Sequence, residues 1–209
     1  MNNTRSANSV VVLDFETTGL SPRLGDRAIE IGAVLLVDGK VIDQFQKLMN
    51  PGFPIDSFIE NYTGITNKML RNKPPCEEVM SEFVEFIGGH NLVAHNASFD
   101  KRFLDAELDY IDKSYSGNFA CSMLIARRIY QESINHTLGE MVDYKCIPTD
   151  GVFHRALADS EMTAKLWLVM LDDIQCQYEF SKISFDLMKR ISRQPKKKVH
   201  EFLQKQLEL

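Results

Sequence analysis

Short apolar runs and amphipathic stretches divide the chain into regular elements. The apolar, β-branched run Val10–Leu13 predicts a buried strand that ends at Asp14. Two further runs, Ile29–Val37 and Val41–Leu48, are joined by an Asp-Gly-Lys segment at 38–40, which is typical of a hairpin. The first part of the chain therefore predicts three strands in an antiparallel meander.

Helical spacing dominates the rest of the chain. The segment Pro51–Pro75 predicts irregular structure with short helical turns, and Glu77–Ile87 predicts a helix that Gly88 ends. Another short strand, Leu92–Ala94, precedes a helix that Ser98 is expected to cap. Later helices are expected over Met123–Tyr130, Thr137–Tyr144, Ala156–Leu171 and roughly Glu179–Ile191. This order predicts an α/β fold, with a mixed sheet covered by helices on both faces.

Length and composition predict one catalytic domain with short additions at its ends. The 209 residues are 44% hydrophobic and 25% charged, as in ordinary soluble globular proteins. We expect a flexible arm over 1–9, the domain over 10–175, and a C-terminal helical extension with a basic segment over 176–209. The N-terminus lacks the apolar core of a signal peptide, and the apolar stretches are shorter than the roughly 20 residues of a membrane span. These features predict a cytoplasmic location and no membrane contact.

Charge and cysteine usage limit the possible functions. The formal net charge of −5 argues against coating duplex DNA through a broad positive surface, although a small nucleic-acid footprint stays compatible with it. An acidic total can also include carboxylates that bind metal. The four cysteines are scattered without a C-x-x-C pair, which argues against a structural zinc site and a disulfide framework. We expect reduced, mostly buried thiols.

The first chemical motif, DFETTGL, lies at the end of the first predicted strand. Asp14 and Glu16 are two residues apart, so their carboxylates project from one face of an extended backbone. Their repulsion is tolerated on a solvated surface or around a cation, and this pair alone is compatible with both. Thr17, Thr18 and Gly19 are small, so they let a ligand approach the backbone, as an ordinary turn also would.

The second motif, VAHNASFD, joins a strand end to a helix start. Asp100 falls in the first helical turn, where an acid is also favoured by the helix dipole alone. His95 and Asn96 are expected to shape the turn or support the site. Phe99 and Phe103 are expected in the core, although an aromatic ring beside a site can stack on a base.

The third motif, FHRALADSEMT, contains His154 and Asp159. On one continuous helix these side chains would point about 140° apart, so we expect His154 in the preceding loop, from which it can reach the pocket that Asp159 enters. A lone histidine is more often a surface or core residue. Together, however, the four carboxylates and this histidine suit two divalent cations about 4 Å apart, as in phosphoryl transfer. Without a nearby cysteine, magnesium or manganese is favoured over zinc.

The three motifs, in this order and spacing, resemble the DEDDh exonuclease family over about Val10–Met170. This family includes epsilon-type proofreading subunits and ribonuclease T, and its ribonuclease H-like fold is therefore expected here. The resemblance implies two Mg²⁺ ions, for which Mn²⁺ would substitute. It implies that Asp14 binds both ions, Glu16 and Asp159 hold one, and Asp100 serves the other. His154 would be the general base.

The resemblance also implies the reaction and the substrate-binding residues. We expect 3′-to-5′ removal of nucleoside 5′-monophosphates from single-stranded ends, with DNA favoured. RNA trimming is the alternative, and an endonuclease or a catalytically inactive interaction module is a more distant one. An inactive module would have lost metal ligands, whereas all five catalytic positions are filled here. The expected substrate-binding residues are Thr17, Thr18, Gly19, Leu20, Asn96 and Phe99.

Several positions depart from the family or suggest partners. Thr63 replaces a histidine of the H-G-I loop, which puts a direct substrate role there in doubt, and Ser160 replaces a frequent alanine without expected consequence. The terminal Gln206–Leu209 faintly resembles sliding-clamp peptides, and a polymerase is another candidate partner. Basic residues suit phosphates or simply solvated helix faces; they are Lys101, Arg102, Arg127, Arg128 and Arg155.

Overall fold

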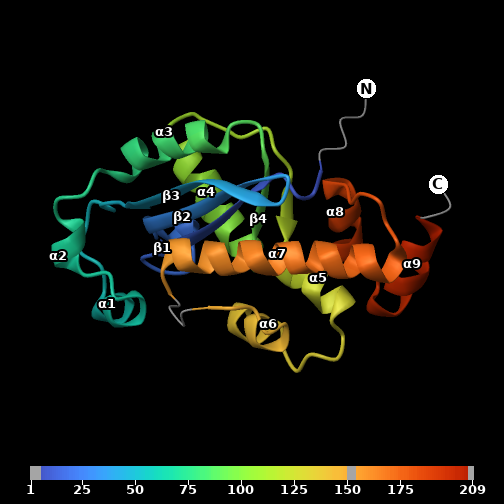
Figure 1. Ribbon diagram of the computed structural model, residues 1–209. Coiled ribbons are helices and arrows are strands. Elements are labelled where there is room, and N and C mark those ends of the chain that lie inside the picture. The colour runs from blue at the N-terminus through green and yellow to red at the C-terminus, as the bar shows by residue number, and fades with distance from the viewer. Residues whose placement is uncertain (1–5, 150–153, 207–209) are drawn as a thin grey trace.

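The computed structural model describes residues 6–149 and 154–206, which form a mixed sheet flanked by helices (Figure 1). The strand order is β3-β2-β1-β4-β5. β1 pairs antiparallel with β2, as β2 does with β3, whereas β4 and β5 run parallel to β1. The strands are β1 Val10–Thr17, β2 Ala28–Val37, β3 Lys40–Leu48, β4 Asn91–Ala94 and β5 Phe119–Cys121. This topology confirms the expected α/β architecture.

Helices cover both faces of the sheet because its central strands, β1, β2 and β4, are buried on both sides. Val10 and Val12 of β1 lie in the core beneath α7, whereas Val11 and Leu13 lie in the core beneath α3 and α4. The helices are α1 Ser57–Thr63, α2 Asn67–Leu70, α3 Cys76–Ile87, α4 Ser98–Asp109, α5 Ser122–Ile129, α6 Leu138–Tyr144, α7 Ala156–Tyr178, α8 Phe185–Arg193 and α9 Val199–Lys205. The even-numbered residues of β1 therefore face α7.

The first turn of α7 lies directly on β2. A Cβ atom at Gly32 would lie 2.1 Å from the backbone nitrogen of Leu157, so only glycine allows this approach. Ser160 is buried and donates a hydrogen bond of 2.8 Å to the carbonyl oxygen of Gly32. Ser160 thus attaches α7 to the sheet, a role that the sequence did not indicate.

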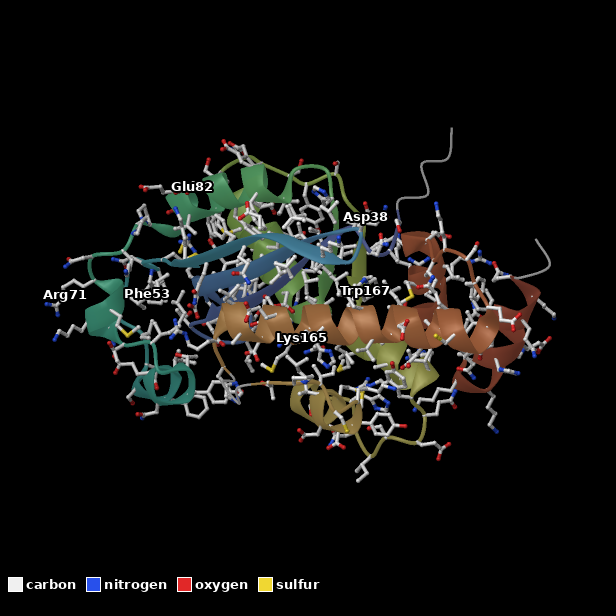
Figure 2. The ribbon with its side chains drawn as sticks, viewed as in Figure 1. Asp38, Phe53, Arg71, Glu82, Lys165 and Trp167 are labelled. Carbon is white, nitrogen blue, oxygen red and sulfur yellow. The ribbon has the colours of Figure 1, made fainter. Side chains whose placement is uncertain are left out.

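Both ends of the described chain pack on the domain. Ala7 is fully buried, donates its N–H to the Ile183 carbonyl at 3.0 Å, and accepts a hydrogen bond of 2.7 Å from the Trp167 indole, labelled in Figure 2. Side chains of α8 and α9 enter the same core as α7. Residues 6–9 are therefore packed, in contrast to the flexible arm expected there. Residues 1–5 and 207–209 of the expected arm and clamp-like tail lie outside the described residues.

Some element boundaries differ from the sequence-based expectation. β1 continues past Asp14 to Thr17 because β2 pairs with it to that point. Ser98 is the first residue of α4 rather than its cap. α7 runs past the expected boundary at 175 to Tyr178, and Glu179 then ends it in a left-handed conformation, φ 55°. None of the helices in the described ranges has the length and apolarity needed to cross a membrane.

Candidate active site

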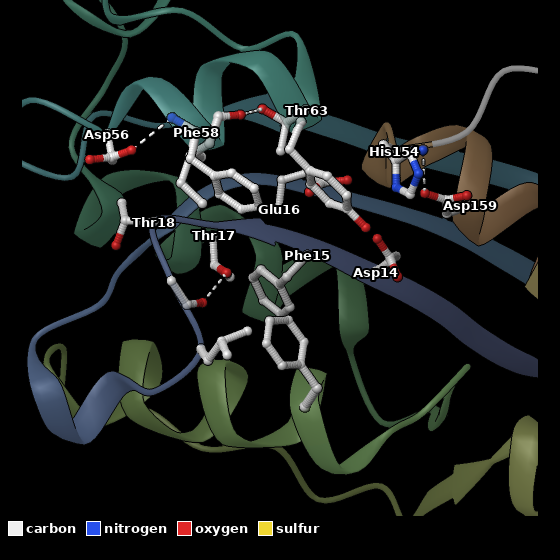
Figure 3. A pocket seen from close by; sticks show the side chains of 15 residues that line it. Asp14, Phe15, Glu16, Thr17, Thr18, Asp56, Phe58, Thr63, His154 and Asp159 are labelled. Atoms are coloured by element: carbon white, nitrogen blue, oxygen red, sulfur yellow. Dashed lines mark hydrogen bonds between the residues drawn. The ribbon is translucent and has the colours of Figure 1, made fainter. Parts of the chain in front are cut away.

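Three carboxylates meet at the end of β1. Asp14 and Glu16 project from the face of β1 that α7 covers, and Asp159 reaches them from the first turn of that helix (Figure 3). One carboxylate oxygen from each of the three residues lies within 4.8 Å of the other two. The two-residue spacing of Asp14 and Glu16 thus places both acids on one face, as expected.

Asp100 joins this group from the opposite side of the sheet. It lies in the first turn of α4, is 2% exposed, and accepts a hydrogen bond of 3.2 Å from the backbone N–H of Phe15. Phe15 stands between Asp14 and Glu16, so Asp100 is anchored to the segment that carries both. The structure therefore brings all four expected acids together, with Asp100 behind the other three.

Desolvation and mutual repulsion make this cluster hold protons. Removal from water raises the pKa of Asp14 well above its usual range, and the charges of Asp100 and Asp159 raise it further. The same causes, burial first, raise the pKa of Glu16 to about 8 and that of Asp100 to about 7. Carboxylate oxygens are the preferred ligands of hard divalent cations, which would relieve this repulsion. The donor set therefore fits such cations.

His154 stands at the edge of the cluster, in the loop where the sequence places it. Its backbone N–H donates to Asp159 Oδ2 at 3.0 Å, and its φ of 61° lies in the left-handed region. The exposed imidazole packs against Tyr62, with ring centroids 4.4 Å apart. His154 and the three acids line one pocket, which is the arrangement needed for a proton acceptor beside a metal cluster.

The sequence-based expectations did not include an ion pair next to His154, between half-buried Arg155 and buried Glu30. Glu30 on β2 is fully buried and lies opposite Glu16 in the strand register. Arg155 donates to it twice, from Nε at 3.1 Å and from Nη2 at 2.8 Å, and the Ala156 N–H donates at 3.2 Å. Arg155 is therefore directed to a carboxylate rather than free for a phosphate. The H-R-A motif drew attention to Arg155 but could not indicate its partner, because Glu30 lies 125 residues away in the sequence.

The pocket has a volume of about 750 Å³ and two chemically different sides. Its acidic side is formed by the carboxylates, and its other side by small and apolar residues. The expected residues that line it are Thr17, Thr18, Gly19, Leu20 and Phe99, and α1 adds Phe58, Ile59, Tyr62 and Thr63. Leu20 is 76% exposed, so an apolar side chain faces solvent at the edge of the pocket. With cations bound to the acids, such a pocket would suit a ligand with a flat apolar part and an anionic part.

Two expected residues of the HNASFD segment shape its turn. Asn96 adopts a left-handed conformation, φ 67°, and is not part of the described lining of the pocket. The His95 imidazole contacts Ser122 Oγ at 2.9 Å and the His136 carbonyl at 2.8 Å, and burial lowers its pKa to about 4. His95 is thus a neutral group that joins β4 to the start of α5.

Thr63, the last residue of α1, has a structural role. Its hydroxyl donates to the Ile59 carbonyl at 2.9 Å and accepts from the Ile65 N–H at 3.1 Å. Thr63 lines the pocket, but these two bonds direct its hydroxyl to the backbone at the end of α1.

Comparison with known proteins identifies the family. The family model RNase_T, described as Exonuclease, matches residues 11–167. The chain belongs to this exonuclease family. The DEDDh resemblance is thereby confirmed.

Similar sequences occur within much longer proteins and as chains of comparable length. The chain is 38% identical over 168 residues to the DNA polymerase III PolC-type of Caldanaerobacter subterraneus subsp. tengcongensis, which covers 79% of this chain but only 12% of the polymerase. It is 32% identical to DNA polymerase III subunit epsilon of Aquifex aeolicus, covering 80% and 83% of the two chains. The chain thus spans about a tenth of the PolC-type relatives.

Solved structures share the fold. A structure of Exonuclease X in complex with 5′ overhanging duplex DNA matches with a TM-score of 0.66 and 28% identity, covering 88% of this chain and 99% of that one. The nuclease domain of 3′hExo, a DEDDh family member bound to rAMP, matches with a TM-score of 0.69 and 20% identity, covering 79% and 92%. These matches confirm the ribonuclease H-like fold.

Proposed function

We propose that this exonuclease removes nucleoside 5′-monophosphates from the 3′ end of single-stranded nucleic acid, using two Mg²⁺ ions for which Mn²⁺ substitutes. The observation that carries this proposal is the shared pocket, in which three clustered carboxylates stand beside His154 and opposite an apolar wall. Its volume of about 750 Å³ is suited to one nucleotide rather than a duplex.

Each acid has a role in this proposal. Asp14, Glu16 and Asp159 would hold one cation, and Asp14 with Asp100 would hold the other. When bound, the cations supply a more acidic water and stabilise negative charge on the phosphate and the leaving 3′ oxygen. His154 accepts the proton of the attacking water, which its exposed place at the pocket edge allows.

The segment after β1 supports recognition of a chain end. Thr17 Oγ1 donates to the Gly19 carbonyl at 2.6 Å, and Asp26 accepts from the Ser21 N–H at 2.9 Å. A Cβ atom at Gly19 would lie 2.5 Å from the Asp26 carboxylate, so this turn is tightly closed. Leu20 is thus held outward, where the terminal base packs against it.

DNA is the proposed substrate, a DNA polymerase the proposed partner, and the cytoplasm the proposed location. The relatives named above include a DNA polymerase and a polymerase subunit, and Exonuclease X was solved with DNA. The four cysteines are free thiols, as is usual in a reducing compartment. RNA trimming is the competing proposal, since the acids serve either polymer equally.

Product analysis tests the proposal directly. Matched single-stranded DNA and RNA oligomers, labelled at the 5′ end, are incubated with Mg²⁺, with Mn²⁺ or with EDTA. We expect a metal-dependent ladder that shortens from the 3′ end, faster on DNA, and its loss in Asp14→Ala. The control is Asp43→Ala, which removes an exposed carboxylate of β3 outside the pocket. Internal cleavage products, or no cleavage of either polymer, would contradict the proposal.

A further inference from the structure

We infer that Glu30 and Arg155 form a positioning pair, which fixes His154 beside the acidic cluster. This inference rests on the proposed function of His154. The pair is not among the described residues that line the pocket. Its effect on the reaction is therefore assigned to the residues to which it is joined.

The pair fixes the backbone on the C-terminal side of His154. Arg155 is the N-cap of α7 and makes no side-chain capping bond of its own. Instead, the Glu30 carboxylate accepts from the Ala156 N–H and from two atoms of the Arg155 guanidinium. A planar guanidinium bound at two atoms has little freedom to rotate, and Gln46 holds the same carboxylate at 2.9 Å.

A separate bond fixes the N-terminal side of His154. Its N–H donates to Asp159 Oδ2, so the residue is held between one acid of the cluster and the Glu30–Arg155 pair. This matters because φ of 61° is unfavourable for a histidine and persists only where neighbouring contacts enforce it. Loosening Arg155 should therefore release the imidazole from its place at the pocket.

Charge explains why an arginine rather than a neutral donor is needed. Glu30 lies opposite Glu16, and its charge adds to the repulsion felt by Glu16 and Asp14. Arg155 opposes this effect at Glu16. A variant without the cation would disturb the acids as well as His154, so the informative substitution is Arg155→Lys. This substitution keeps the positive charge and removes the two hydrogen bonds that the guanidinium donates to Glu30.

The test is a double-mutant cycle between Arg155→Lys and His154→Ala, measured by steady-state kinetics on a DNA oligomer. We expect Arg155→Lys to lower kcat about 10- to 100-fold, with KM changed less than about twofold, because a misplaced catalytic group costs turnover. In the His154→Ala background the same substitution should change kcat less than about twofold. The matched control is Arg27→Lys, which loosens another buried arginine–glutamate pair. Its effect should multiply with that of His154→Ala.

A second measurement does not depend on activity. In NMR spectra of the imidazole nitrogens, Arg155→Lys should shift or broaden the His154 resonances, whereas Arg27→Lys should leave them in place. Unchanged resonances, or a kcat loss of equal size in both His154 backgrounds, would overturn the positioning role. If the wild-type protein cleaves no oligomer, the proposed function fails, and the resonances alone then decide whether Arg155 fixes His154.

Discussion

Two arginine–glutamate pairs, each with a buried glutamate, hold helices to the same strand, and they differ in the residues beside them. Glu30 of β2 binds Arg155 and the Ala156 N–H at the start of α7. Glu107 of α4 binds Arg27, at 3.0 Å and 2.9 Å, and the Ala28 N–H at 2.9 Å, at the start of β2. The bonding pattern is the same, but only the Arg155 pair adjoins His154.

This difference shows how the same arginine–glutamate pairing can serve the stability of the fold or the chemistry of the site. Arg27 is bound by other groups as well, since it donates to Glu77 at 2.8 Å and lies 4.5 Å from the Tyr110 ring centroid. The Arg27 pair therefore fixes α4 within the core. A buried ion pair adds little net stability over an apolar replacement, although breaking one is costly. What each pair contributes is a defined backbone position.

The largest expected effect comes from removing the group that the Arg155 pair is inferred to position. His154→Gln should lower kcat about 10²- to 10⁴-fold, because a general base contributes that much. Mn²⁺ binding, measured by calorimetry, should be unchanged because the acids remain. Turnover within a few fold of the wild type would remove His154 from the mechanism.

Breaking each pair should separate stability from turnover. Arg27→Met should cost about 3–5 kcal/mol of unfolding free energy, because Glu107, 1% exposed, would be left with a buried charge and the Ala28 N–H. Arg155→Met should cost less, since the arginine is 36% exposed and Glu30 keeps Gln46 and Ala156 as donors, yet it should lower kcat more. Urea unfolding measures the loss of stability, and steady-state rates measure the change in kcat. The reverse order would contradict the comparison.

The pH dependence of stability should distinguish the two regions next. Burial and repulsion raise the pKa of Glu16 from 4.5 to about 8, so the folded state binds more protons than the unfolded state between these values. The metal-free protein should therefore lose stability as pH rises from about 5 to 8. Glu16→Gln should flatten this slope in thermal melts, whereas Arg27→Met should lower the melting temperature without flattening it. A stability that rises over this range would refute the assignment.

The smallest effect is expected at the contact between α7 and β2. Ser160→Ala removes the 2.8 Å bond to Gly32 and should cost about 1 kcal/mol, with kcat unchanged within about twofold. Chemical unfolding and steady-state rates test this. A large loss of turnover would mean that Ser160, as well as Arg155, positions the residues at the start of α7.

Local sequence patterns predicted the site residues better than the ion pairs that hold the surrounding backbone. The period of two along β1 placed Asp14 and Glu16 together, and helix geometry put His154 in a loop, because both rules act over a few residues. The partners of Arg155 and Arg27 lie 125 and 80 residues away. Such pairings depend on how helices pack on the sheet, and no local spacing encodes them.

The same limit explains the missed fold features. β5 has three residues, too few for a pattern, and owes its place to pairing with β4. The helix expected from Glu179 begins only at Phe185, because Glu179 itself turns left-handed after α7. Ser160 was passed over because its acceptor, Gly32, is 128 residues away.

The burial of Trp167 gives the protein an internal optical probe. It is the single tryptophan of the sequence, its indole N–H is bound to Ala7, and its ring lies 6.1 Å from that of Phe185 in α8. The segment that precedes β1, α7 and α8 therefore meet at the Trp167 indole. Its emission wavelength reports whether Ala7 and α8 are docked on α7, without any attached label.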